Sequence, residues 1–304
     1  MQHFLTTEDL AIETINNLIQ RAQLMAQTPE NFQSLARHQQ LATLFFEPST
    51  RTRLSFTSAM HSLGGTVLGF ESSLSTSTTK GESLIDTIRV VSQYADIIVL
   101  RHPQAGAAEL AAKYASVPVI NAGDGDHLHP TQTLADLAAI TQYKHRLNHL
   151  TLAFAGDLKY GRTVHSLVQA LLQYGQNRFI FVSHSSLKIP VTLRTQLMAK
   201  NIDFIEINSF DDIHAPLDVI YMTRVQAERF ENPDEYEQVK DAVQLTTAQQ
   251  KLLSPNTLLL HPLPRGQELP TYFDHFPQAH YFDQVKAGRF VRMALIAYLL
   301  AQKH

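Results

Sequence analysis

The chain has 304 residues, of which 44% are hydrophobic and 17% charged, with a formal net charge of −3 and no cysteine. This length predicts about two domains with substantial cores, the charge does not favour a nucleic-acid partner, and the lack of cysteine excludes disulfides, thiolate metal sites and thiol nucleophiles. Because no apolar stretch is long enough to span a bilayer and no secretory signal opens the sequence, we expect a cytoplasmic protein without a membrane partner.

Secondary structure is predicted to alternate along most of the chain. A capping pattern at Thr6 and Asp9 predicts a first helix that continues to Met25. Short apolar runs then predict strands at 41–46, 66–70, 96–100, 117–121, 150–155, 179–183, 202–207, 218–222 and 257–261. Helical patterns separate most of them, at 51–63, 82–94, 107–114, 131–143, 163–174 and 193–200. The alternation predicts an α/β fold with two parallel sheets and a boundary after residues 121–129.

Ligands of such sheets bind beyond the carboxyl ends of the strands, so the segments that follow the strands are the candidate sites. The first is 47–53, Glu-Pro-Ser-Thr-Arg-Thr-Arg, which leads directly into a helix. Its three hydroxyls and two arginines at a helix start predict an oxyanion or phosphate site. The alternative is an ordinary helix cap beside solvated arginines.

Further strand ends carry cationic or polar residues. They are Arg101, the segment 121–132 with His129, the segment 156–163 with Arg162, the segment 221–230 with Arg224, and the segment 261–266. Each alone fits an ordinary loop, but together they predict an anion-binding site. In the last segment, the Leu263–Pro264 step is expected to turn backbone carbonyls toward a ligand, because prolines lack the competing N–H.

The same residues suggest two other functions, metal binding and nucleotide hydrolysis. The pairs His127 with His129 and His145 with His149 suggest a metal, but no carboxylate stands at a suitable spacing, so we expect no metal and interpret His129 as a hydrogen-bond donor. Residues 156–163 have P-loop spacing, but Arg162 occupies the position of the phosphate-binding lysine and is not its equivalent. Nucleotide hydrolysis is therefore a minor alternative to carboxylate recognition by arginine.

Seven motifs occur in order along the chain: FFEPSTRTR, KGESLIDT, LRHPQAG, NAGDGDHLHPTQTLADL, AGDLKYGRTVHSL, YMTRVQAERF and HPLPRG. By these motifs the chain resembles the aspartate/ornithine carbamoyltransferase family. STRTR and HPTQ are shared by carbamoyltransferases in general, whereas TRVQAER and an HPLPR without cysteine match the members that use aspartate.

The resemblance implies transfer of a carbamoyl group from carbamoyl phosphate to L-aspartate, a step of de novo pyrimidine (UMP) biosynthesis. The alternatives are an ornithine-type carbamoyltransferase, a P-loop-like nucleotide-binding protein and a catalytically silent small-molecule binder. The resemblance also implies no cofactor, a homotrimer with shared active sites, and two three-layer α/β/α domains with mostly parallel sheets; regulatory chains in a larger assembly are left open. These domains would be a carbamoyl phosphate-binding domain at 1–130, completed by a C-terminal helix at 288–304, and an aspartate-binding domain at 131–287.

The resemblance further implies roles for individual residues. Carbamoyl phosphate would be bound by Ser49, Thr50, Arg51, Thr52, Thr76, Arg101, His129, Gln132, Leu263 and Pro264. Aspartate would be bound by Lys80, Arg162, Arg224 and Gln226. A closed domain arrangement would be held by Glu47, Lys159, Tyr160, Arg229 and Glu235. The catalytic set would be Arg51, Thr52, Lys80, Arg101 and His129. Thr76 matches a position that reaches over from the neighbouring subunit, with Ser75 and Ser77 as alternatives.

Overall fold

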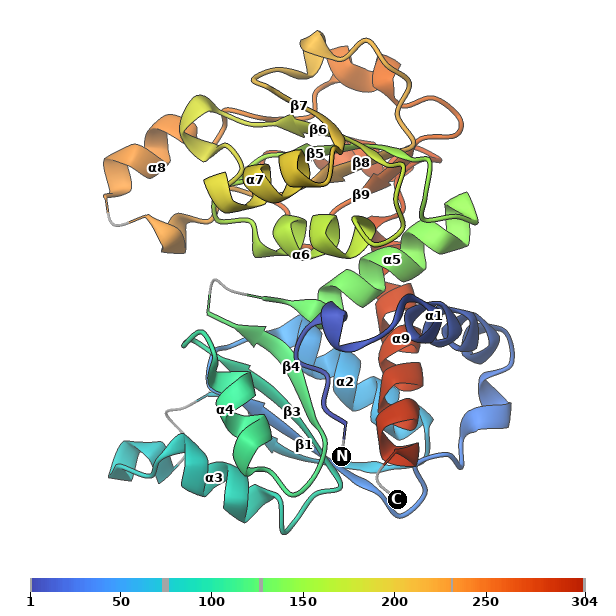
Figure 1. Ribbon diagram of the computed structural model, residues 1–304, viewed down its shortest axis with the longest axis vertical. Coiled ribbons are helices and arrows are strands. Elements are labelled where there is room, and N and C mark those ends of the chain that lie inside the picture. The colour runs from blue at the N-terminus through green and yellow to red at the C-terminus, as the bar shows by residue number, and fades with distance from the viewer. Residues whose placement is uncertain (1, 73–76, 126–127, 231, 303–304) are drawn as a thin grey trace. The chain divides into compact units, whose positions relative to one another are not determined.

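The computed structural model describes residues 2–72, 77–125, 128–230 and 232–302. The chain divides into two compact units (Figure 1). Unit 1 comprises Met1–Ala138 and Lys286–His304, and unit 2 comprises Ala139–Val285. Each contains one sheet, and all strand pairs among the described residues are parallel. The predicted α/β fold with two parallel sheets is confirmed.

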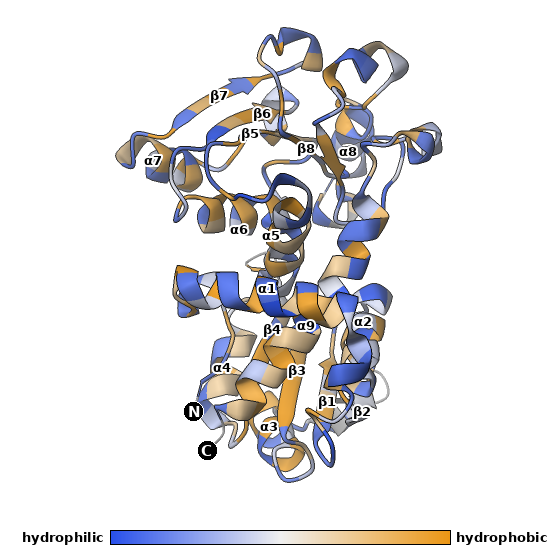
Figure 2. Ribbon diagram, turned by 90° about the vertical axis from the view of Figure 1, so that its right-hand side faces the viewer, coloured by the Kyte–Doolittle hydropathy of each residue, from blue (hydrophilic) through white to orange (hydrophobic). Residues whose placement is uncertain are grey.

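Unit 1 holds a four-stranded sheet in the order β2-β1-β3-β4. Its strands are β1 (Gln40–Phe45), β2 (Thr66–Phe70), β3 (Ile97–His102) and β4 (Val119–Asp124). Its helices are α1 (Ile12–Gln27), α2 (Thr50–Ser62), α3 (Leu84–Val91) and α4 (Ala107–Tyr114), with parts of α5 (Pro130–Lys144) and α9 (Tyr281–Ala301). The helices α3 and α4 pack their apolar residues on one face of the sheet, while α2 contacts β1 and β2. Figure 2 shows β3, one of the two central strands, as hydrophobic over most of its length.

Unit 2 holds a five-stranded sheet in the order β7-β6-β5-β8-β9. Its strands are β5 (Thr151–Ala155), β6 (Arg178–Val182), β7 (Asp203–Ile207), β8 (Val219–Met222) and β9 (Leu258–Leu260). Its helices α6 (Arg162–Leu171) and α7 (Val191–Ala199) cover one face (Figure 1), and α8 spans Pro233–Val239. On one face of the sheet, the Phe154 ring packs among those of Phe179, Phe181 and Tyr221, with centroid distances of 5.6–6.1 Å. Short 3₁₀ helices containing Phe210 and Phe273 pack on the other face.

Two local predictions need correction, and one helix was missed. The capping box of Thr6 and Asp9 exists, but it caps a 3₁₀ turn at Thr7–Asp9, and α1 begins only at Ile12, after an uncapped Ala11. The C-terminal helix begins at Tyr281 rather than near Gly288, because no helix-breaking residue separates the two positions. Helix α8 was not predicted, although Asn232 caps it and Pro233 occupies its first turn.

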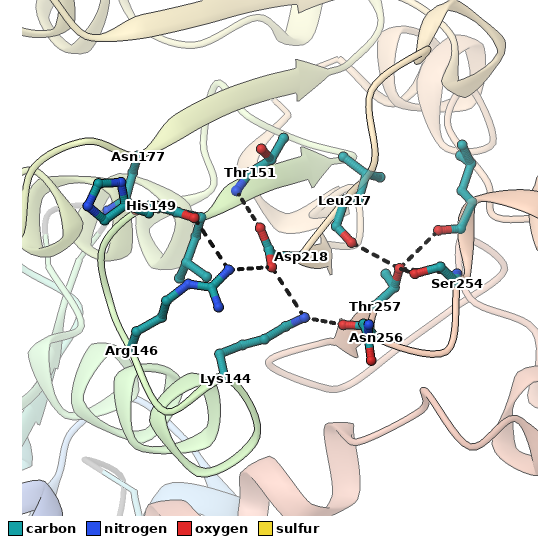
Figure 3. Close-up of polar contacts among 12 residues, drawn as sticks. Lys144, Arg146, His149, Thr151, Asn177, Leu217, Asp218, Ser254, Asn256 and Thr257 are labelled. Atoms are coloured by element: carbon teal, nitrogen blue, oxygen red, sulfur yellow. Dashed lines mark hydrogen bonds and ion pairs between the residues drawn. The ribbon is translucent and has the colours of Figure 1, made fainter.

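The amino-terminal edge of the unit 2 sheet is closed by a polar cluster around Asp218 (Figure 3). The Asp218 carboxylate accepts a hydrogen bond from the Thr151 N–H at 3.0 Å and pairs with Arg146 at 3.0 Å and Lys144 at 3.5 Å. Beside it, the Thr257 hydroxyl donates to the Leu217 carbonyl at 3.0 Å. These contacts occupy the edge opposite to the carboxyl ends of the strands, where ligands of parallel sheets bind.

The Asp218 cluster makes a stability prediction. Replacing Asp218 with alanine leaves one partly buried strand amide and two cations without their carboxylate, so the free energy of unfolding should fall by about 1–3 kcal/mol. The control is Asp203→Ala, because Asp203 pairs with Arg178 on the surface and its side chain is 66% exposed, so the loss should stay below about 1 kcal/mol. Urea unfolding followed by circular dichroism measures both. Equal losses in the two variants would contradict the assigned role of Asp218.

Candidate active site

Both sheets contain one place where the chain reverses its winding direction. In unit 1 the chain goes from β1 to β2 on one side and then to β3 and β4 on the other, so the reversal lies between β1 and β3. In unit 2 it lies between β5 and β8 by the same reasoning. The crossover connections diverge at such a point and leave room for a ligand at the carboxyl ends of the two strands. The segments after β1, β3, β5 and β8 are four of those that the sequence singled out.

The loop after β1 ends at the start of α2. Ser49 is the N-cap residue, but its hydroxyl does not bond a helix amide and instead donates to the Thr52 Oγ1 at 3.1 Å. The interpretation as an ordinary side-chain cap is therefore wrong. Thr52 is buried, whereas Thr50 and Arg51 are exposed. Because Ser49 makes no side-chain cap, the start of α2 presents the positive end of the helix dipole, which favours an anion.

Arg101 is fixed beside this loop at the end of β3. It is 7% exposed, its backbone carbonyl accepts from the Phe46 N–H at 2.8 Å, and it lies opposite Phe45 in the register of β1 and β3. Its guanidinium pairs with the Glu47 carboxylate and donates to the Ala122 carbonyl at 3.3 Å. The structure thus brings two predicted residues, Glu47 and Arg101, into direct contact.

The loop that leads from β4 to His129 is supported by a buried acid. Asp124 accepts from the Gly106 N–H at 2.9 Å, from the Asn121 side chain at 3.0 Å and from the Leu128 N–H at 3.3 Å. His129 is buried, and its carbonyl accepts from the Gln132 N–H at 3.0 Å as α5 begins.

The last two predicted residues of unit 1 lie in or beside the polar segment after β2. Lys80 ends a 3₁₀ helix at Ser77–Lys80 and is exposed. Thr76 lies outside the described residues, as does Ser75.

In unit 2 the loops after β5 and β8 touch each other. Gly156, which follows β5, has a φ of +119°, and a Cβ there would lie 2.0 Å from the Thr223 carbonyl oxygen. Thr223, which follows β8, donates its hydroxyl to the Ala155 carbonyl at 3.2 Å. Only glycine permits this approach, and it brings the segments with Arg162 and Arg224 side by side.

Asp157 organises the loop between β5 and α6. It has no exposed surface, and its Oδ1 accepts from the Tyr160 N–H at 2.9 Å and the Lys159 N–H at 3.2 Å. Burial raises the pKa of Asp157, and the amide hydrogen bonds oppose that rise. Arg162 then begins α6 and is buried, and the Gln226 side chain donates to the Tyr160 carbonyl at 3.4 Å. Arg224 is half-buried.

Next to this loop, aromatic rings join it to the segment after β8. The Lys159 ammonium lies 4.9 Å from the centre of the Tyr160 ring, which packs on Phe230 at 5.7 Å. Arg229 ends a 3₁₀ helix at Ala227–Arg229 and is half-buried, while Glu235 is exposed in the first turn of α8.

The loop after β9 has an unusual backbone. Leu263 has a φ of +53°, and the Leu263–Pro264 peptide bond is cis. The Leu263 N–H donates to the His261 Nδ1 at 2.8 Å, so the hydrogen of this imidazole is on Nε2, which lies 2.8 Å from the Glu268 Oε1. The same Glu268 oxygen accepts from the Gly266 N–H at 2.7 Å. His261 and Glu268, which are 1% and 4% exposed, hold the loop in this conformation.

The sequence interpretation gave no role to the acids Asp124, Asp157 and Glu268. Two of them stand at or directly after strand ends, in NAGDGD and AGD, and the third follows HPLPRG by two residues. Such positions are typical of loop-supporting carboxylates, but an acid in a loop is too common for the position alone to predict burial. Among the described residues, no group of three or more metal-ligating side chains is found, and no helix is both long and apolar enough to cross a membrane.

Two histidines of unit 2, the buried His261 and the half-buried His165, predict a pH dependence of stability. Burial lowers the pKa of His261 and of His165, whose Nε2 donates to the Leu158 carbonyl at 2.7 Å. The unfolded chain therefore binds more protons below about pH 6.5, and stability should be lost as the pH falls from 6.5 toward the lower folded-state values. Melting temperatures between pH 7.5 and 5.5 test this. His165→Gln should flatten the slope and His214→Gln, at an exposed position, should not; a slope of opposite sign would contradict the prediction.

Comparisons with known proteins cover both units. The carbamoyl-P binding domain of aspartate/ornithine carbamoyltransferase matches residues 2–142, and the Asp/Orn binding domain of the same family matches residues 148–299. The aspartate carbamoyltransferase catalytic subunit of Finegoldia magna is 50% identical over 299 residues, with 98% of each chain covered. That of Clostridium perfringens is 48% identical over 302 residues, with 99% of this chain and 98% of the relative covered.

Solved structures agree. The catalytic subunit of aspartate transcarbamoylase from M. jannaschii superposes with a TM-score of 0.92 at 46% identity, covering 99% of both chains. The aspartate transcarbamoylase of Trypanosoma cruzi, in complex with N-(phosphonacetyl)-L-aspartic acid, gives a TM-score of 0.91 at 34% identity over 98% of this chain and 95% of that one. With both domain models matched and relatives this similar over nearly the whole length, the chain belongs to the aspartate/ornithine carbamoyltransferase family.

Proposed function

We propose that this chain is an aspartate carbamoyltransferase, which transfers the carbamoyl group of carbamoyl phosphate to the amino group of L-aspartate and releases N-carbamoyl-L-aspartate and phosphate in de novo pyrimidine biosynthesis. The observation that carries the proposal is the placement of arginines at the winding reversals of both sheets. The Trypanosoma cruzi relatives were solved with carbamoyl phosphate and aspartate and with carbamoyl aspartate and phosphate, which supports the same chemistry.

The unit 1 residues suit a phosphorylated donor. We infer that the amides and hydroxyls at the start of α2, with Arg51, bind the phosphate, because a helix start with a guanidinium offers charge-assisted hydrogen bonds to an oxyanion. Thr52, Arg101 and His129 would donate to the carbonyl oxygen. The amino group would be met by the Gln132 side chain and by the carbonyls of the 263–264 step.

The unit 2 residues suit a dicarboxylic acceptor. Arg162 and Arg224 would bind the two carboxylates of aspartate, and the Gln226 side chain would add a hydrogen bond. Lys80 would serve both substrates. An acceptor with two carboxylates requires several cations, which a cationic acceptor such as ornithine does not.

The proposed reaction needs no protein nucleophile. The aspartate amine attacks the carbamoyl carbon, a C–N bond forms, and the carbonyl oxygen takes the negative charge of a tetrahedral intermediate. The C–O bond to phosphate then breaks, and the departing phosphate accepts the amine proton. Each donor aimed at the oxyanion is worth on the order of 2.7–4 kcal/mol, and the alignment of two small substrates supplies much of the remaining acceleration.

We also propose that the protein works in the cytoplasm as a cyclic homotrimer whose active sites are shared between neighbours. The support is family resemblance together with the exposed position of Lys80, which ends a 3₁₀ helix beyond β2. Glu47, Lys159, Tyr160, Arg229 and Glu235 would hold a closed arrangement of the two domains, which we take as 1–130 with 288–304 and as 131–287.

A single assay tests the activity. Carbamoyl phosphate consumption is measured with aspartate, with ornithine and with neither, and ATP hydrolysis is measured separately. We expect phosphate release with aspartate only and N-carbamoyl-L-aspartate by mass spectrometry. Turnover with ornithine would indicate the ornithine-type enzyme, ATP hydrolysis would indicate a nucleotidase, and no turnover would indicate a binding protein.

Arg51 and Arg53 offer a matched pair. Arg51→Ala removes the proposed phosphate partner and should lower kcat to less than one-tenth, a loss of more than about 1.4 kcal/mol. Arg53→Ala removes an arginine that pairs with Glu71 at 2.5 Å at the surface, so kcat should stay near that of the unchanged protein. Steady-state kinetics with circular dichroism as the folding control distinguishes the two; an Arg51→Ala variant above one-tenth would refute the phosphate role.

Hybrid trimers test the shared site. Arg51→Ala and Lys80→Ala homotrimers should each be nearly inactive. If Lys80 serves the neighbour's site in a closed ring, mixing equal amounts after dissociation should restore about a quarter of the sites by random assortment. Native mass spectrometry confirms that hybrids form. Confirmed hybrids without recovered activity would mean that each site is complete within one chain.

A further inference from the structure

We propose that the buried Asp136 carboxylate, with the buried Arg292 guanidinium nearby, fixes the Gln132 carboxamide with its oxygen toward the carbamoyl donor, so that the enzyme recognises the donor's amino group and discriminates against acyl phosphates that lack it. This inference rests on the proposed function and deepens it. All three residues belong to unit 1. Asp136 and Arg292 are positioning residues, because they act through Gln132.

The first observation is the contact between Gln132 and Asp136, one helical turn apart on α5. The Gln132 Nε2 lies 2.7 Å from the Asp136 Oδ1, and Asp136 has no exposed surface. An ionised carboxylate only accepts hydrogen bonds, so the NH₂ side of the carboxamide must face it. The Gln132 Oε1 therefore lies on the other side of the amide and is available as an acceptor, and Gln132 itself is only half-buried.

The second observation is a buried cation near Asp136. Arg292 on α9 is 5% exposed, and its Nη1 lies next to Gly288, which faces Ala135, the residue before Asp136. Burial lowers the pKa of Arg292 to about 10 and the Asp136 charge opposes this, so the guanidinium remains protonated at neutral pH. A buried carboxylate is costly to keep ionised without such a cation. If Asp136 were protonated, it could donate to Gln132, and the carboxamide could turn its NH₂ group toward the donor instead.

The third observation is how Arg292 is held. Its Nη1 donates to the Ser55 hydroxyl at 2.9 Å, and its guanidinium lies 5.3 Å from the centre of the Phe56 ring, both on α2. Gly288, one turn earlier on α9, provides the space, because a Cβ there would lie 2.7 Å from the Arg292 Nη1 and 3.1 Å from the Ala135 Cβ. The arginine thus contacts α2, which begins at the phosphate segment, and lies beside α5, which carries Gln132.

An oxygen acceptor at this position selects by chemistry. The NH₂ group of carbamoyl phosphate donates to the Gln132 oxygen, whereas the methyl group of acetyl phosphate, which has almost the same shape, does not. Loss of the carboxamide orientation therefore weakens the binding of carbamoyl phosphate and leaves the binding of acetyl phosphate unchanged. Damage to the phosphate site, in contrast, weakens the binding of both compounds equally.

The experiment compares Asp136→Asn with the unchanged protein. The readouts are kcat/KM for carbamoyl phosphate at saturating aspartate, and the inhibition constant of acetyl phosphate. We expect kcat/KM to fall at least tenfold while the inhibition constant changes less than twofold. Equal changes in both constants, or no change in either, would overturn the proposal.

Further variants keep the test decisive if Asp136→Asn folds poorly. Gly288→Ala acts on Arg292 from outside the site and should give the same selective loss. Arg292→Lys retains the positive charge but not the forked guanidinium group. Its kcat/KM for carbamoyl phosphate should fall less than that of Arg292→Met. The matched control is Arg289→Lys, because Arg289 also reaches from α9 to α2, where it bonds the Ser62 hydroxyl at 2.5 Å, and should leave the selectivity unchanged.

A double-mutant cycle separates positioning from general stability. In a Gln132→Leu background, Asp136→Asn should have no further effect on the ratio of the two constants, because the group that it positions is gone. Additive effects would show that Asp136 acts elsewhere and would refute the proposal. Absence of carbamoyl transfer by the unchanged protein would instead refute the proposed function, so the two failures are distinguishable.

Discussion

Each parallel sheet reverses its direction of winding once, and this topology decides where a ligand can bind. At the reversal, the crossover connections that follow the two neighbouring strands lead to opposite sides of the sheet. The carboxyl ends of these two strands therefore face a space that no crossover fills. In unit 1 that position carries Arg51 and Arg101, and in unit 2 it carries Arg162 and Arg224. The same fold in each unit thus offers a place for an anion, and the residues at the strand ends decide which anion.

Several of these segments are each supported by a buried acid. Asp157 and Glu268 each accept two hydrogen bonds from the loop that they hold, and Asp124 accepts one from the Leu128 N–H of its own loop and one from the Gly106 N–H at the start of α4. For Glu268, burial alone would raise the pKa, but the bonds from His261 and the Gly266 N–H outweigh it and lower the pKa. Removing such a carboxylate leaves several buried donors unpaired, which costs more than the loss of a single surface bond. Hydrogen bonds to these acids therefore fix the backbone of the segments in which the predicted site residues lie.

The sequence was sufficient to predict the nine strands and their parallel arrangement, because apolar runs and turn residues are local signals. It could not predict where the first helix begins, since the Thr6 capping box also fits a 3₁₀ turn. It identified Gln132 by resemblance but not the roles of Asp136 and Arg292, which are 156 positions apart and belong to the same unit only because α9 returns to unit 1. Contacts that depend on tertiary packing leave no local pattern to read.

The charge pattern of unit 2 bears on the choice of acceptor. A cationic side chain such as that of ornithine needs an available carboxylate, but Asp157 is fully buried with its Oδ1 bonded to two loop amides, and Glu268 is bonded to His261. Burial also lowers the pKa of His261, so this imidazole adds no charge of its own at neutral pH. Arg162 and Arg224 stand in the segments after β5 and β8, and guanidinium groups at these positions favour an acceptor whose own groups are carboxylates.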